Sequence, residues 1–137
     1  MDPLYFLIPI FFVVAAVGLY FIAPRAHDRL GAFWVRRCEG RAWRRTFPTA
    51  SNEEIRRFLE LFMDAFAMPR GRMLRFAPTD RIFEIYRAFN PPGWPDALEL
   101  ETLDKLLSEN YGLRLNDCWK ESLSLGELFA RARRVVV

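Results

Sequence analysis

Reactive side chains are few in this chain of 137 residues, and their spacing supports no known catalytic chemistry. His27 is the only histidine, so neither a histidine-based triad nor a histidine-rich metal site can be assembled. Cys38 and Cys118 lack the C-x-x-C spacing of redox or zinc motifs, and no glycine-rich phosphate loop is present. The sequence therefore predicts a protein that is not an enzyme and that holds no metal or cofactor.

Charge is the chemistry that the sequence concentrates most clearly. Residues 96–128 carry eight acids and three bases, and they begin with DALELETLDKLLSENYGLRLN. The leucines of this stretch recur at helical spacing, which predicts an amphipathic helix with acids on its outer face. Such a face can dock a protein partner with a basic surface, or it can simply be solvated. The candidate partner-binding acids are Glu99, Glu101 and Asp104.

Asp96-Ala97-Leu98 resembles the Asp-Ser-Leu motif of acyl carrier proteins, whose serine carries the phosphopantetheine arm. The resemblance continues through the acidic helix to an aromatic, Tyr111, and to an apolar exit at Leu113 and Leu115. It implies a carrier-like bundle of four helices, the third of them short, over about residues 51–134. Ala97 stands at the attachment position and has no hydroxyl to esterify. The resemblance therefore implies a carrier-like fold that cannot hold phosphopantetheine.

Two further segments support the resemblance or depart from it. Ser124-Leu125-Gly126-Glu127 is a capping box at the place where carriers begin their last helix. Residues 87–95, RAFNPPGWP, lengthen the approach to the acidic helix, and their prolines and glycine make a helix there unfavourable. Phe89 and Trp94 in this insertion either anchor a partner or fold back onto the core. Ser122 resembles a displaced attachment serine, but its position before the last helix indicates a turn.

The start of the soluble domain is marked by another capping box. Ser51 and Glu54 have the spacing of N-cap and N3 residues, after the break at Phe47-Pro48. Apolar residues then follow at helical spacing as far as Phe66, and Met68-Pro69 should stop that helix near Ala67. The fold class expected is all-α, with residues 49–137 as the carrier-like domain.

The N-terminal segment predicts a membrane anchor. Residues 3–24 contain no charged side chain, and 22 helical residues extend roughly 33 Å, against about 30 Å for a hydrocarbon core. A cleaved signal peptide is the alternative, but it would need a basic start and a shorter apolar core. Residues 1–24 are therefore interpreted as a transmembrane helix.

A basic collar follows the anchor. Residues 25–48 contain seven arginines against two acids, which favours the cytoplasmic side, so that the N-terminus lies outside a bacterial inner membrane. The collar either contacts anionic headgroups, partly as an interfacial helix, or only sets the topology. No nucleic-acid motif accompanies it. The membrane-surface candidates are Arg25, Arg29, Trp34, Arg36 and Arg37.

Three functions are compatible with these features. The first is a membrane-tethered adaptor that binds a protein through the acidic helix and the insertion. The second is an immunity-type inhibitor that protects its own membrane. The third is an accessory subunit of a larger membrane complex, in which the small residues near Gly18 allow close helix contact. The first follows most directly from the residues.

Overall fold

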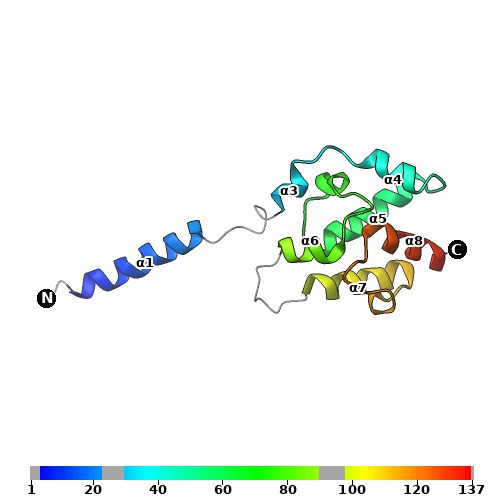
Figure 1. Cartoon of the computed structure of the whole chain (residues 1–137). Helices are drawn as coiled ribbons and strands as arrows, with labels where there is room; N and C mark the ends of the chain where they lie inside the picture. Colours follow the sequence, from blue (N-terminus) through cyan, green and yellow to red (C-terminus); the bar gives the residue numbers. More distant parts are fainter. Residues whose placement is uncertain (1–3, 23–29, 90–97, 137) are drawn as a thin grey trace.

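The computed structural model describes residues 4–22, 30–89 and 98–136, and within these ranges the fold is all-helical, without a β-strand (Figure 1). This confirms the all-α prediction. In chain order the elements are α1 (Leu4–Ile22), α3 (Gly31–Trp34), α4 (Gly40–Thr46), α5 (Asn52–Ala65), the 3₁₀ helix η1 (Arg70–Arg75), α6 (Ile82–Phe89), α7 (Leu98–Tyr111), the 3₁₀ helix η2 (Leu115–Asp117) and α8 (Leu125–Val136).

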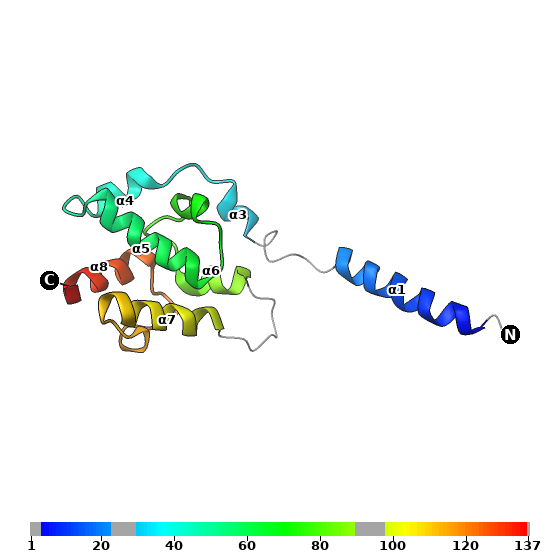
Figure 2. The same ribbon diagram turned by 180° about the vertical axis from the view of Figure 1, so that it is seen from behind.

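Helix α1 lies apart from the helical domain in both ribbon views (Figures 1 and 2). Within α1, side-chain burial is described for residues 8–18, and none of these belongs to the hydrophobic core. The large apolar side chains of α1 from Ile8 to Val17 are between 49% and 72% exposed. Within the part of the chain that the structure describes, no helix combines the length and the hydropathy of a membrane span.

Helix α5 is the central element of the domain. The Ser51 hydroxyl accepts a hydrogen bond from the Glu54 amide (3.1 Å), and the Glu54 carboxylate accepts one from the Ser51 amide (2.7 Å). This confirms the predicted capping box, which satisfies two amides at the helix start. The helix ends at Ala65, two residues before the predicted stop, and Ala67 has a positive φ of 51°. Its buried face consists of Ile55, Phe58, Leu59, Leu61, Phe62, Met63 and Ala65.

The segment before α5 packs into the same core. Leu30 is 1% exposed and Trp43 is fully buried, and both belong to the same core cluster as the buried residues of α5. The Trp43 ring lies 5.9 Å from the ring of Phe129 and 6.4 Å from that of Phe58, measured between centroids. Two short helices, α3 and α4, form in this segment, which the sequence left open as a partly interfacial helix or a topology signal. Apolar residues among arginines can face a protein core as readily as a membrane, and Leu30 and Trp43 face the core.

Residues 78–82 connect the middle of the domain to the start of α8. The amides of Leu125 and Gly126 donate to the carbonyl oxygens of Asp80 (2.9 Å) and Pro78 (2.8 Å), and the Ile82 amide donates to the Leu123 oxygen (3.0 Å). Ser124, the predicted N-cap, accepts a hydrogen bond from the Glu127 amide at 3.1 Å. These hydrogen bonds join residues 78–82 to residues 123–126, two segments that lie far apart in the sequence.

The G126A substitution should destabilise the contact between these two segments. A Cβ at Gly126 would lie 2.9 Å from the Pro78 carbonyl oxygen and 3.0 Å from its Cβ, so the backbone must shift. Overpacking of this kind costs about 1–3 kcal/mol. Urea unfolding followed by circular dichroism should show the loss. G71A is the matched control, because nothing lies within 4 Å of a Cβ at Gly71; equal midpoints for the two variants would contradict the expectation.

Helix α6 differs from the sequence expectation. The proline-rich insertion was expected to lack a helix from residue 87 onward, but α6 continues through Arg87 and Ala88 to Phe89. The prolines of the insertion begin at position 91, after the helix has ended, so they remove no hydrogen bond from it. The apolar residues Ile82 and Ile85 are fully buried, which anchors α6 on the core.

Candidate partner-binding groove

Helix α7 has one buried face and one exposed acidic face. Leu103 and Leu107, one turn apart, are fully buried, whereas Glu101, Lys105 and Glu109 are exposed. Residues at i and i+4 share a helix face, so these two sets occupy different sides of α7. The amphipathic pattern predicted from the sequence is therefore present. Leu106 is only partly buried and packs against the core from its edge.

The chain reverses direction at the end of α7. Gly112 has a φ of +66°, a left-handed conformation that favours glycine. Its amide donates to the Ser108 carbonyl oxygen (3.0 Å), and the Leu113 amide donates to that of Leu107 (3.4 Å). These two bonds satisfy carbonyl groups at the helix end. The reversal brings Leu113 and Leu115 back into the core, where both are buried.

Asp104 secures this exit. Its carboxylate accepts a hydrogen bond from the Leu115 amide at 2.7 Å and forms an ion pair with Arg114 at 3.3 Å. The Asp104 side chain is 25% exposed, less than its neighbours on the acidic face. Of the three candidate acids, Asp104 therefore stabilises the turn that follows α7. Glu101 is exposed and has no ion pair with any residue of the described ranges, so its charge is available.

The exit and α7 together enclose a groove of about 280 Å³. Its walls are apolar at Leu100, Leu115 and Trp119, and its rim carries carboxylates. The Trp119 ring is partly buried and lies 6.3 Å from the Phe83 ring, in an edge-to-face arrangement that holds it in place. The groove, called the α7 groove below, is lined by Leu100, Glu101, Asp104, Leu115, Asn116 and Trp119.

Trp119 and Asn116 were not among the candidates derived from the sequence. They follow α7 in the chain and reach Glu101 only because Gly112 reverses the backbone. No periodic pattern links positions 101 and 119. A glycine directly after an amphipathic helix is the one signal in the sequence that indicates such a return.

Of the two aromatic residues of the insertion, only Phe89 lies within the described residues. Phe89 lies in the last turn of α6, with its ring 6.0 Å from that of Phe66 and packed against the core. This is the placement expected if Phe89 folds back onto the domain. Trp94 and Ala97 lie outside the described residues. Glu99 lies in the first turn of α7, where the positive end of the helix dipole stabilises a carboxylate.

Two of the membrane-surface candidates, Trp34 and Arg36, form contacts with other residues of the domain. Arg36 donates to both carboxylate oxygens of Asp80, at 2.8 and 2.7 Å, and Asp80 is a buried acid that also accepts from the Ala77 amide. The Trp34 ring lies 5.6 Å from that of Phe76, with the guanidinium of Arg72 above it. These contacts stabilise the domain, whereas Arg37 is exposed. Arg25 and Arg29 lie outside the described residues.

The two cysteines differ in accessibility. Cys38 is exposed, whereas Cys118 is buried, and burial raises the pKa of the Cys118 thiol. Reaction with maleimide requires the thiolate, so Cys38 should react first. In the described ranges, no group of three or more histidine, cysteine or acidic residues could hold a metal ion.

No protein-family model, no curated protein and no solved structure matches the chain.

Proposed function

We propose that this protein is a non-catalytic, carrier-like adaptor that is attached to a membrane through α1 and binds a protein partner in the α7 groove. The observation that carries the proposal is the combination of apolar walls with the negative charge of Glu101, which no ion pair within the described ranges neutralises. An apolar side chain of the partner would enter beside Trp119, and a flanking lysine or arginine would meet Glu101. Interfaces commonly combine such an anchor with charges on the rim.

A pull-down of the full-length protein in mild detergent, followed by mass spectrometry, tests the partner. The expected result is a protein that is captured by the wild type and lost when salt is raised, because exposed charges are screened beyond about 8–10 Å at physiological salt. A partner retained equally by E101K would show that the α7 groove is not its site. An accessory subunit of a larger complex would lose its contact when α1 is replaced by an unrelated apolar helix. An immunity-type inhibitor would instead capture a toxin.

Membrane attachment is proposed from the uncharged sequence of residues 3–24, although no helix in the described ranges has by itself the length and hydropathy of a span. Helix α1 includes no charged residue, and its described large apolar side chains, from Ile8 to Val17, are exposed. Exposed apolar surface of this kind marks contact with a membrane or a protein, and contact with lipid removes it from water. We propose a single pass through a bacterial inner membrane, with the N-terminus outside and the domain in the cytoplasm. The arginines that follow α1 favour this orientation.

The exposed thiol of Cys38 offers a test of this topology. A membrane-impermeant maleimide added to intact spheroplasts should leave the protein unlabelled, and it should label one cysteine after the membrane is opened with detergent. The C38S variant should then remain unlabelled, because Cys118 is buried. Labelling of Cys38 in sealed spheroplasts would place the domain on the outer side and contradict the proposal.

Loss of carrier chemistry is a separate prediction. Incubation of the protein with coenzyme A and a phosphopantetheinyl transferase should produce no increase in mass, because alanine offers no hydroxyl at position 97. A genuine acyl carrier protein in the same tube is the positive control. An increase in mass equal to the phosphopantetheine arm would identify another serine as the attachment site, and S122A would then test the exposed turn residue Ser122.

A further inference from the structure

The edge of the domain that carries α4 is strongly basic. Residues 31–47 contain five arginines and one glutamate, a formal charge of +4. Arg36 is engaged by Asp80, but the other four are exposed. No ion pair joins any of these four to another residue in the described ranges. They form what is called the α4 edge below: Arg37, Arg41, Arg44 and Arg45.

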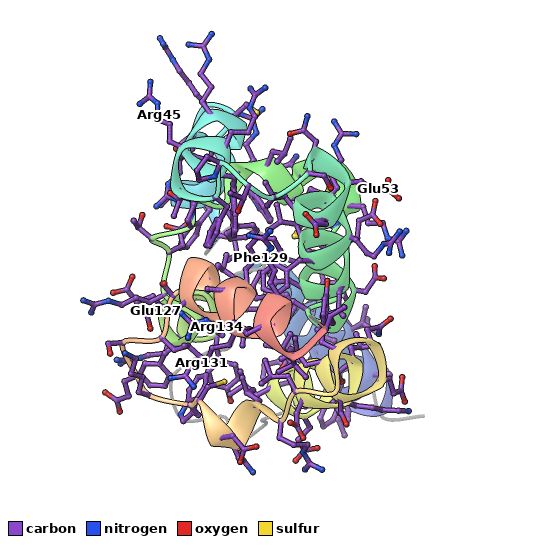
Figure 3. The ribbon with its side chains drawn as sticks, turned by 90° about the vertical axis from the view of Figure 1, so that its right-hand side faces the viewer. Arg45, Glu53, Glu127, Phe129, Arg131 and Arg134 are labelled. Atoms are coloured by element: carbon purple, nitrogen blue, oxygen red, sulfur yellow. The ribbon has the colours of Figure 1, made fainter. Side chains whose placement is uncertain are left out.

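The helical geometry of α4 explains why these side chains point outward. Trp43 is fully buried, which fixes the inner side of the helix. Arg41 and Arg45 lie two residues before and after it, about 200° around the helix axis, so both project away from the core. Arg41 and Arg45 are also one turn apart and share a face. Figure 3 shows Arg45 extending from the end of the domain that α4 occupies.

The acidic helix lies at the opposite edge. Figures 1 and 2 place α4 and α7 on opposite sides of α5, and Figure 3 shows the same separation from the side. Helix α7 contains four acids and one lysine, a formal charge of −3. The domain therefore has a positive edge and a negative edge, and any charged surface close to it would favour one orientation.

The connection to α1 keeps the domain close to such a surface. Seven residues, 23–29, separate Ile22 from Leu30. Even a fully extended chain of this length spans only about 29 Å between the two Cα atoms. Leu30 is packed in the core, so the domain itself begins where the connection ends. With α1 in a membrane, the domain would remain beside the headgroups.

We propose that the α4 edge contacts anionic lipid headgroups and thereby turns α7 and its groove away from the membrane. This inference rests on the proposed attachment through α1. Arginine suits such a contact because its planar guanidinium can donate two parallel hydrogen bonds to a phosphate. The orientation leaves the α7 groove open to a partner that approaches from solution.

The experiment uses the full-length chain in lipid nanodiscs, with a fluorescent donor on a cysteine and an acceptor on a small fraction of the headgroups. The wild type carries its own reporter, because Cys38 is exposed beside Arg37 and Cys118 is buried. The variant C38S/E109C places the same donor on α7, at an exposed position whose only described ion pair, with Lys105, is long at 4.0 Å. Discs of phosphatidylcholine alone are compared with discs that also contain phosphatidylglycerol.

With phosphatidylglycerol, energy transfer from the donor on Cys38 should exceed that from the donor on α7 at least twofold, and the difference should vanish in neutral discs. The variant R41Q/R44Q/R45Q should remove the difference, and so should high salt. The control R81Q/R87Q/R131Q removes three arginines elsewhere and should preserve it. Equal transfer from both positions in anionic discs, or a difference that survives R41Q/R44Q/R45Q, would overturn the proposal.

Two further outcomes would point to a different role for the α4 edge or for α1. If the α4 edge instead receives the acidic α7 of a second copy, a mixture of donor-labelled and acceptor-labelled chains will show transfer that rises with the number of chains per disc and not with lipid charge. That result also overturns the proposal. If the chain fails to enter discs at all, the attachment through α1 is wrong as well. Normal incorporation with no orientation rejects the α4 edge alone and leaves the adaptor function standing.

Discussion

Replacing Trp43 by alanine (W43A) should lower the free energy of unfolding of the domain by about 4 kcal/mol, within the range found for large aromatic residues in cores. Trp43 is fully buried and contacts three phenylalanine rings. Its Nε1–H donates to the Phe76 carbonyl oxygen at 2.8 Å. The substitution removes these contacts and leaves a buried acceptor without its donor, which adds to the cost of the cavity.

Urea unfolding of the detergent-solubilised chain, followed by circular dichroism, measures this loss. W43F separates its two components, because phenylalanine retains much of the ring packing and loses the hydrogen bond, which should cost about 1–3 kcal/mol. R45A, on the exposed side of the same helix, should change stability by less than about 0.5 kcal/mol. If W43A unfolds at the same urea concentration as R45A, the segment before residue 49 does not belong to the core.

The second large effect concerns the α7 groove. The variant E101K should weaken capture of the partner at least tenfold, which corresponds to about 1.4 kcal/mol. The substitution places a positive charge against the basic surface that the groove is proposed to bind, and like charges across an interface are strongly unfavourable. Glu101 is exposed, so the fold should not change. The association rate of the purified partner, measured at two salt concentrations, reports the electrostatic part directly.

The choice of variants follows from the contacts of each acid. Asp104 would be a poor target, because its carboxylate holds the Leu115 amide and pairs with Arg114, so a reversed charge would disturb the exit from α7. E53K is the matched control: Glu53 is an exposed acid on α5 whose i,i+4 pair with Arg57 contributes little to stability. Figure 3 shows Glu53 away from α7. If E53K and E101K reduce capture equally, only net charge matters, and the α7 groove is not the site.

Local sequence patterns predicted the capped helix starts and the buried face of α7. Both capping boxes placed a serine at the start of a helix, and the leucine spacing of α7 identified its buried face. Capping and periodicity depend on residues within four positions of one another, so a linear reading contains the necessary information. The prediction failed in α6, where prolines after the helix were taken to exclude the helix itself.

The contacts of residues 25–48 could not be predicted from local sequence patterns. Tryptophan and phenylalanine among arginines are compatible with both a bilayer interface and a protein core, since both offer an apolar layer beside a polar one. The partners of Trp34 and Arg36 lie more than 35 positions further along the chain, at Phe76 and Asp80. Only the folded arrangement of α3 and the segment after η1 brings them together.

Composition and local spacing were thus sufficient for the helical class, for the capped helix starts, for the acidic face of α7 and for the absence of a hydroxyl at position 97. These properties reside in single residues or in one helical turn. The α7 groove, the burial of Trp43 and the opposition of the α4 edge to α7 required the tertiary structure. Each depends on segments that are distant in sequence and meet through Gly112, Asp80 or the core, and no local pattern encodes those meetings.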